Sequence, residues 1–204
     1  MGADNHIKAI IWDMGGVILR SEHYEHRDEL AARFEISEAE LEHRVFNSES
    51  ADLATVGKIS QVEHWRNTAF GFGLHEDEIA GFEEAFWAGD RCDQDLVRFI
   101  RDLRPRFKTG LLSNAWMGTR EVLRDRYQCL DAFDVAVFSY EVGMAKPDPR
   151  IYAHLLAMMN VVPENAVFID DFIINVKAAR EIGMHSIHFT GREQAIQELS
   201  ELIK

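Results

Sequence analysis

Ile7–Gly16 reads IKAIIWDMGG, an apolar run followed by an aspartate and two glycines. A short run rich in β-branched side chains is typical of a buried strand, because these side chains pack well on a pleated surface. The glycines after Asp13 favour a tight turn, since glycine adopts backbone conformations that other residues avoid. We therefore predict a first strand at Ile7–Trp12 whose end carries the carboxylate of Asp13.

Four similar apolar runs follow in the chain: Thr109–Leu112, Val135–Phe138, Ala166–Ile169 and Ser186–Phe189. Helical periodicity marks the segments before, between and after them: Asp95–Leu103, Thr119–Arg126, Arg150–Met159, Ile174–Ile182 and Glu193–Ile203. Strands that alternate with helices predict βαβ units around a parallel sheet. The expected fold class is therefore α/β, with a Rossmann-like core flanked by helices. Gly183 fits the position just past the end of a helix.

Residues 21–90 interrupt this alternation. Their periodicity is helical and shows no convincing buried strand, with helices expected at His23–Phe34, Ser37–Phe46, Ser60–Phe70 and Glu76–Trp87. Ser37 with Glu40, and Ser60 with Glu63, have the spacing of a capping box. The segment holds 17 acidic and five basic residues, a net charge of −12, against −1 for the rest of the chain. We predict a catalytic core at residues 1–20 and 91–204, and an inserted all-helical cap at residues 21–90.

Charge and composition restrict the kinds of molecule that this 204-residue chain could bind. Its formal charge of −13 disfavours nucleic acid and anionic membrane surfaces. No apolar run approaches the roughly 18–20 residues of a membrane helix, and the first residues lack a signal-peptide pattern. Two cysteines, Cys92 and Cys129, cannot build a disulfide framework. We expect a cytoplasmic monomer or small homo-oligomer that binds a small molecule.

Polar residues follow four of the predicted strands: Asp13, Ser113 with Asn114, Lys146, and Asp170 with Asp171. A parallel sheet brings these strand ends to one edge, where ligands bind. There a carboxylate can act as nucleophile, while a hydroxyl, backbone amides and a lysine can hold phosphoryl oxygens. A carboxylate pair can hold Mg²⁺. Each residue alone is as typical of a turn or a helix cap, but the combination indicates phosphate chemistry on a small phosphorylated metabolite.

In order, these stretches resemble the four motifs of the haloacid dehalogenase superfamily. They are IIWDMGGV at Ile10–Val17, LLSN at Leu111–Asn114, GMAKPD at Gly143–Asp148, and VFIDD at Val167–Asp171 with Asn175 beyond it. The insertion resembles the helical cap of the subgroup that has its cap after the first motif. Within that subgroup the chain is most similar to sugar-phosphate phosphatases, of the glucose 1-phosphate type, and to the phosphatase half of bifunctional epoxide hydrolases.

The resemblance implies catalytic roles. Asp13 would attack phosphorus and form an aspartyl-phosphate that water then hydrolyses. Ser113 and the backbone at Asn114 would bind phosphoryl oxygens of the substrate. Lys146 would stabilise Asp13 and the transferring group.

It also implies a metal site and a site for the leaving group. Mg²⁺ would bind Asp13, the main-chain carbonyl of Gly15, and the two acids of the last motif, with Asp171 as direct ligand and Asp170 direct or through water. A glycine-centred cap loop contacts the leaving group in relatives, which makes Lys58 a substrate-binding candidate. Weaker candidates are His23, Arg27, Arg44, Trp65 and Arg66. We expect Trp65, Phe70, Phe72, Phe82, Phe86 and Trp87 to form the core of the cap.

One position departs from the family pattern. The usual phosphatase motif has a second aspartate two residues after the nucleophile, as general acid and base, and this chain has Gly15 there. Such proton transfer typically contributes about 10²–10⁴-fold. A sugar 1-phosphate, whose anomeric oxygen needs less protonation, would tolerate the loss. Two alternatives stay open: a metal-free 2-haloacid dehalogenase that uses the same aspartate, and a pseudo-enzyme that only binds a phosphorylated ligand.

Overall fold

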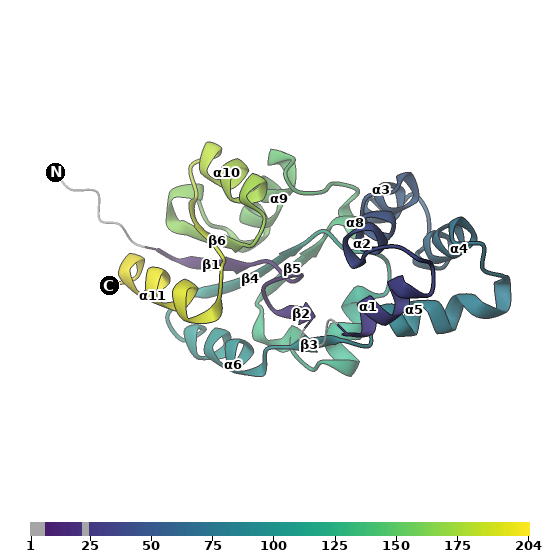
Figure 1. The fold of residues 1–204 in the computed structure, drawn as a ribbon. Coiled ribbons are helices and arrows are strands. Elements are labelled where there is room, and N and C mark those ends of the chain that lie inside the picture. Colours follow the sequence, from purple (N-terminus) through teal and green to yellow (C-terminus); the bar gives the residue numbers. More distant parts are fainter. Residues whose placement is uncertain (1–6, 22–24) are drawn as a thin grey trace.

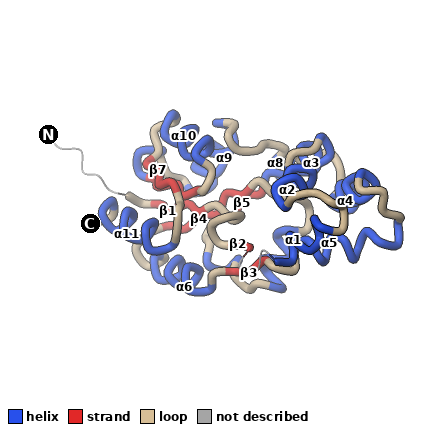
Figure 2. The backbone as a smooth tube through the Cα atoms, in the orientation of Figure 1, coloured by secondary structure: helices blue, strands red, loops and turns tan. Residues whose placement is uncertain are grey.

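The computed structural model describes residues 7–21 and 25–204. Its centre is a parallel sheet of five strands in the order β5-β4-β1-β6-β7 (Figures 1 and 2). The strands are β1 (Ala9–Trp12), β4 (Lys108–Ser113), β5 (Val135–Phe138), β6 (Ala166–Asp170) and β7 (His185–His188). Each predicted strand is present with its ends within two residues of the prediction, and the α/β fold class is confirmed.

Helices cover both faces of this sheet. In Figure 1, α9 (Pro149–Met159) and α10 (Ile173–Glu181) lie above it, and α6 (Gln94–Leu103) and α11 (Arg192–Leu202) lie below it. Side chains of β1 alternate between the two faces. Ile10 and Trp12 pack in one apolar cluster, while Ala9 and Ile11 pack in the other. Because both faces are covered, this strand is a continuous apolar run.

The predicted core helices are present, with small differences at their ends. Thr119–Arg126 consists of one α-helical turn, α7 (Thr119–Glu121), which continues as a π-helical turn at Val122–Arg126. Short helical segments that the pattern does not predict lie at Leu130–Ala132, Ser139–Val142 (α8) and Pro163–Asn165. Gly183 has a φ of +94° just past the end of α10, as expected of a residue that ends a helix.

The described part of the insertion between β1 and α6 carries five helices: α1 (Glu25–Ala32), α2 (Glu38–Phe46), α3 (Glu49–Thr55), α4 (Gln61–Gly71) and α5 (Ile79–Trp87), with a 3₁₀ turn at Glu76–Glu78. Ser37 and Ser60 begin α2 and α4 as predicted, since each hydroxyl accepts a backbone N–H three residues on. The pattern does not predict α3. This helix is only seven residues long, and its cap Ser48 has Ala51 rather than a glutamate three residues later.

Two short strands flank these helices. β2 (Leu19–Ser21) and β3 (Asp90–Cys92) pair antiparallel where the chain leaves for the insertion and returns from it. Neither strand has an apolar run, because most of their side chains are only partly buried, so sequence periodicity does not reveal them. The predicted boundaries at residues 20/21 and 90/91 fall inside this pair, and the division into core and cap stays a prediction.

One side chain from the loop after β4 completes the apolar cluster of the insertion. The Trp116 ring stacks on Phe46 with centroids 5.8 Å apart, and its Nε1 donates to Thr55 Oγ1 at 3.1 Å. Trp65, Phe82 and Phe86 are buried in this cluster, and Phe72 and Trp87 are partly buried against it, as predicted. The expectation for Phe70 is wrong, because its side chain lies on the solvent side of α4 and is 51% exposed.

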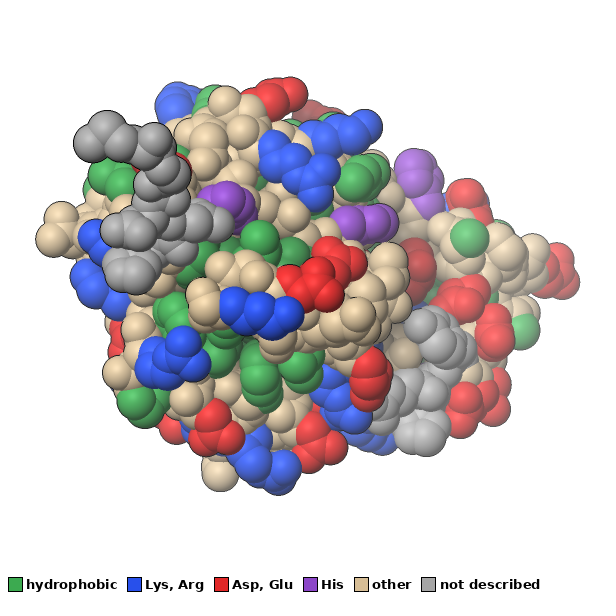
Figure 3. Space-filling view, turned by 90° about the vertical axis from the view of Figure 1, so that its left-hand side faces the viewer, with side chains coloured by type: hydrophobic (Ala, Val, Ile, Leu, Met, Phe, Trp, Pro, Cys, Tyr) green, Lys and Arg blue, Asp and Glu red, His purple; other side chains and the backbone are tan. Residues whose placement is uncertain are grey.

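The surface of the core carries charges of both signs, in line with the near-neutral charge of its sequence. Acidic and basic side chains are interspersed over the face of the core that Figure 3 shows. Within the described part of the chain, no helix combines the length and the apolar character that crossing a membrane requires.

Candidate active site

Three carboxylates meet at the carboxyl edge of the sheet. Asp13 directly follows β1, and its backbone N–H donates to the carbonyl of Ile169 at 2.8 Å, which fixes it beside β6. Asp170 ends β6, and Asp171 is the next residue. One oxygen from each of these three carboxylates lies within 4.8 Å of the others. The convergence predicted from the strand ends is therefore present.

Lys146 lies between two of these carboxylates. Its Nζ is 2.6 Å from Asp13 Oδ1 and 2.7 Å from Asp170 Oδ2, and its side chain is only 1% exposed. Asn114 holds the lysine backbone from both sides, because its Nδ2 donates to the Lys146 carbonyl at 2.9 Å and its Oδ1 accepts the Lys146 N–H at 2.8 Å. The side chain of Asn114 thus positions the loop that carries Lys146.

The two acids after β6 differ in their hydrogen bonding. Both oxygens of Asp170 accept from the protein: Asn175 Nδ2 donates to each at 3.1 Å, and the Phe172 N–H donates to Oδ1 at 2.7 Å. In contrast, Asp171 Oδ1 is buried and has no hydrogen-bond partner among the described residues. A buried carboxylate oxygen without a donor is costly unless a cation satisfies it. The three acids therefore fit a hard divalent cation such as Mg²⁺, with Asp171 free to bind it directly.

The carboxylates interact strongly with one another. Burial raises the pKa of Asp13 to about 7, with Asp170 and Asp171 adding to this effect and Lys146 opposing it. Burial and the charge of Asp170 raise the pKa of Asp171 to about 6. Burial also lowers the pKa of Lys146, but Asp13 and Asp170 outweigh it and hold that pKa above its ordinary value. The lysine therefore stays charged at neutral pH, and a dication would favour the ionised form of both acids.

We expect Mg²⁺ to stabilise the protein more at about pH 8 than at about pH 5. The pKa values of Asp13 and Asp171 are higher in the folded protein than the 3.8 of the unfolded chain. Protonation of these two groups therefore contributes to the stability of the metal-free fold at pH values below 3.8, and this contribution is lost as the pH rises through about 6 for Asp171 and about 7 for Asp13. A bound dication offsets that loss, whereas protons compete with it at low pH. Melting temperatures with Mg²⁺ and with chelator at both pH values measure the increment. An equal or larger increment at the lower pH would contradict the expectation.

Ser113 ends β4 and is 1% exposed. Its hydroxyl makes only a long contact, 3.4 Å, with the carbonyl of Asn114. The Ala115 N–H just beyond donates to Ser139 Oγ at 2.9 Å, which holds the turn after the strand against α8. Because this contact is long, the hydroxyl of Ser113 can give it up and donate its single proton to a ligand at the sheet edge.

The two glycines after Asp13 have different surroundings. A Cβ on Gly16 would lie 2.0 Å from Asp171 Oδ2, and the residue has a φ of +73°, so only glycine fits beside this carboxylate. Gly15 is exposed, and a Cβ there would meet no atom within 4 Å. The position that usually carries an acid therefore has room for one.

Lys58 lies in the connection between α3 and α4 and is exposed. Among the residues placed by the structure, its ammonium has no hydrogen bond or ion pair. The preceding Gly57 has a φ of +70°, and a Cβ on it would lie 2.4 Å from the Tyr140 carbonyl of α8. The loop thus rests closely on a core segment shortly before Lys146, although no contact places Lys58 itself at the carboxylates.

The weaker candidates have structural partners. Arg27 is buried, pairs with Glu42, and lies 2.9 Å from Asp90 Oδ1. Arg44 forms an ion pair with Glu40, and Arg66 forms one with Glu76. The side chain of Trp65 is fully buried in the apolar cluster of the insertion. His23 lies outside the described residues.

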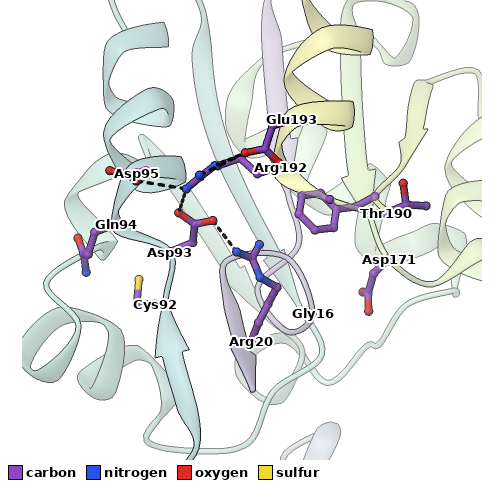
Figure 4. Close-up of a pocket in the computed structure, with 12 residues that line it drawn as sticks. Gly16, Arg20, Cys92, Asp93, Gln94, Asp95, Asp171, Thr190, Arg192 and Glu193 are labelled. Atoms are coloured by element: carbon purple, nitrogen blue, oxygen red, sulfur yellow. Dashed lines mark hydrogen bonds and ion pairs between the residues drawn. The ribbon is translucent and has the colours of Figure 1, made fainter. Parts of the chain in front are cut away.

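A cavity lies beside the carboxylates. It measures about 650 Å³ and is lined by Gly16 and Asp171 together with Arg20, Asp93 and Arg192 (Figure 4). Neither Asp13 nor Lys146 lines it. Arg20, Asp93 and Arg192 are not predictable from the sequence, because each is an ordinary charged residue without a motif around it.

Comparison with known proteins identifies related hydrolases. The family model for haloacid dehalogenase-like hydrolases matches residues 7–183. The chain is 27% identical to a sesquiterpene phosphatase of Aspergillus oryzae, over 96% of each protein. It is 24% identical to a D-ribitol-5-phosphate phosphatase of Bacteroides thetaiotaomicron, over 97% of this chain and 98% of that one.

A solved structure shares the fold. It is a haloacid dehalogenase family enzyme of Bacteroides thetaiotaomicron in complex with magnesium and inorganic phosphate, with a TM-score of 0.76 and 22% identity over 94% of this chain and 98% of the other. The matched family model spans all four motifs and most of the chain. The protein therefore belongs to the haloacid dehalogenase-like hydrolases.

Proposed function

We propose that this hydrolase is a Mg²⁺-dependent phosphatase of small phosphate monoesters, with Asp13 as its nucleophile. The observation that carries the proposal is the meeting of buried Asp13 and Lys146 with half-buried Asp171, one oxygen of which has no donor among the described residues. Relatives named as phosphatases over nearly the full length of this chain support the same reaction.

In the proposed reaction an oxygen of Asp13 attacks phosphorus. The bond from phosphorus to the leaving-group oxygen breaks, and an aspartyl-phosphate forms. A water molecule then attacks phosphorus, which restores the carboxylate and releases inorganic phosphate. Lys146 holds Asp13 Oδ1 at 2.6 Å, which orients the nucleophile, and its charge balances the negative charge of the transferring group.

The metal proposal follows from which oxygens remain available. Mg²⁺, when bound, supplies positive charge that lets an anionic phosphate approach three carboxylates. We propose Asp13, Asp171 and the carbonyl of Gly15 as its direct ligands. Asp170 already accepts from Lys146, Asn175 and the Phe172 N–H, so it orients Lys146 and contributes to the metal directly or through water.

Gly15→Asp should raise phosphatase activity. An aspartate there could protonate the leaving group and later activate water, which typically contributes about 10²–10⁴-fold. The space around position 15 accommodates the new side chain. We expect the largest gain on alkyl phosphates and the smallest on p-nitrophenyl phosphate, whose leaving group needs no proton. Gly15→Asn controls for size without an acid, and an equal gain from it would contradict a proton-transfer role.

Two classes of leaving group are candidates. The Gly15 position favours esters that leave without a proton, and sugar 1-phosphates of the glucose 1-phosphate type meet that requirement. The relatives bear names from two classes, a pentitol phosphate and a sesquiterpene phosphate.

Lys58, held in a loop that rests on α8, would contact hydroxyl or phosphate oxygens of a polar substrate. Lys58→Met should then raise KM for sugar phosphates more than for isoprenoid phosphates.

A panel of phosphate esters tests the proposal. It contains p-nitrophenyl, glucose 1-, ribitol 5- and farnesyl phosphates, each measured with Mg²⁺, with chelator, and with Asp13→Asn as background. We expect phosphate release from at least one ester, abolished by chelator. Turnover of a sugar 1-phosphate without turnover of p-nitrophenyl phosphate would contradict the leaving-group argument.

The two open alternatives give different results in the same assay. Halide release from 2-chloropropionate that chelator does not affect would identify a dehalogenase. Phosphate release on no ester above the Asp13→Asn background would contradict phosphatase activity, and binding of inorganic phosphate by such a protein would identify a pseudo-enzyme.

A further inference from the structure

The cavity beside the carboxylates separates two groups of residues. Asp171 and Gly16 lie on one side of it, and the ion pairs of Arg20, Asp93 and Arg192 lie on another, as Figure 4 shows. Val17 and Ile18 anchor the turn after Asp13 in the apolar core. On the side that faces this cavity of about 650 Å³, polar contacts add to that anchoring.

Asp93 is the centre of these contacts. It follows β3, and its side chain is only 5% exposed. Its Oδ1 accepts the Leu96 N–H at the start of α6 and Arg192 Nη1, both at 2.9 Å, and its Oδ2 accepts Arg20 Nη2 at 2.5 Å. We call these three charged residues the Arg20–Asp93–Arg192 cluster. It joins β2, α6 and α11, which are far apart in the sequence.

Two members of the cluster also hold the turn after Asp13. Arg20 Nη1 donates to the Val17 carbonyl at 2.7 Å, and the Asp93 N–H donates to the Ile18 carbonyl at 2.9 Å. Within the turn, the Gly16 N–H donates to the Leu19 carbonyl at 2.9 Å. Arg192 pairs with Asp93, Asp95 and Glu193, and among the described residues no hydrogen bond or ion pair joins it to this turn.

The position of the turn matters because Gly16 lies directly against Asp171. A Cβ on Gly16 would lie 2.0 Å from Asp171 Oδ2, so an inward shift of the turn would collide with this carboxylate. An outward shift into the cavity would move the Gly15 carbonyl away from it. Groups that orient a metal ligand without touching the metal typically change metal affinity about 10–100-fold when removed.

We propose that Arg20 and Asp93 are positioning residues that hold the Gly15–Gly16 turn against Asp171 and so set the affinity of this site for a divalent cation. The inference rests on the proposed function for the identity of the cation as Mg²⁺. It does not depend on phosphate release, because its readout is metal binding.

Arg20→Met and Arg192→Met form a matched pair of variants. Each leaves Asp93 with one arginine partner, but only Arg20→Met also removes a bond to the turn. Titration calorimetry with Mg²⁺ on purified protein measures the dissociation constant, and melting temperatures in chelator confirm that each variant is folded. We expect Arg20→Met to weaken Mg²⁺ binding about 10-fold and Arg192→Met to weaken it much less. Arg20→Lys, which keeps the charge but not the two-pronged contact, should fall between wild type and Arg20→Met.

Equal weakening by the two methionine variants, or none from Arg20→Met, would overturn the positioning role and leave the cluster a purely structural one. Should Arg20→Met fail to fold, Arg20→Lys against Arg192→Lys provides the same comparison. A wild-type protein that binds Mg²⁺ but releases phosphate from no ester would contradict the proposed function while the metal affinities still test the positioning role.

Discussion

Asp13→Asn should abolish phosphate release while the protein remains folded. An amide is a poor nucleophile, and loss of a catalytic nucleophile lowers kcat by roughly 10⁴- to 10⁶-fold in well-studied hydrolases. Steady-state release of phosphate from the best ester of the panel measures the effect.

The fold should tolerate this change because the ionised carboxylate is costly in the metal-free protein. Burial raises the pKa of Asp13 to about 7, so removal of its charge relieves repulsion with Asp170 and Asp171. We therefore expect the melting temperature of Asp13→Asn in chelator at about pH 8 to equal or exceed that of wild type. Residual activity within tenfold of wild type would show that another group is the nucleophile.

Lys146→Met should cost both stability and activity. The ammonium of Lys146 is 1% exposed and pairs with Asp13 at 2.6 Å and with Asp170 at 2.7 Å. Removing one partner of a buried ion pair typically costs about 3–5 kcal/mol, because the remaining charge is left uncompensated. Loss of a donor that stabilises developing charge lowers kcat by about 10²–10³-fold. Denaturant unfolding in chelator and phosphate release with Mg²⁺ measure the two effects.

Two controls separate the loss of stability from a general loss of positive charge. Lys58→Met removes an exposed lysine without ionic partners among the described residues, and it should leave the unfolding midpoint unchanged. The double variant Lys146→Met with Asp13→Asn should be more stable than Lys146→Met alone, since one unpaired carboxylate is then absent. A destabilisation by Lys146→Met no larger than that by Lys58→Met would contradict the ion-pair interpretation.

The candidate site was predictable where one local pattern decides the position of a residue. Asp13, Ser113 and Asp170 lie at the ends of apolar runs, and parallel strands bring such ends to one edge. Lys146 lies farther from its strand, so its place depended on the motif around it. The exposed position of Phe70 and the existence of α3 were not predictable in this way, because helical periodicity does not say which face a neighbouring helix covers.

By itself, the sequence determined the order of strands and helices along the chain, the helical character of the insertion, and the residues that line the sheet edge. These features follow from the spacing of apolar residues and from the residues next to each strand end. The tertiary structure alone decided that Gly16 packs on Asp171, that Trp116 packs among the helices of the insertion, and that Asp93 binds Arg20 and Arg192.

The physical reason is the distance along the chain between partners. Asp93 is separated from Arg20 by 73 residues and from Arg192 by 99. With 35 acidic and 22 basic residues, composition allows very many such pairs, and no local pattern selects among them. Only the packing of the sheet, α6 and α11 brings these three side chains to one side of the proposed metal site.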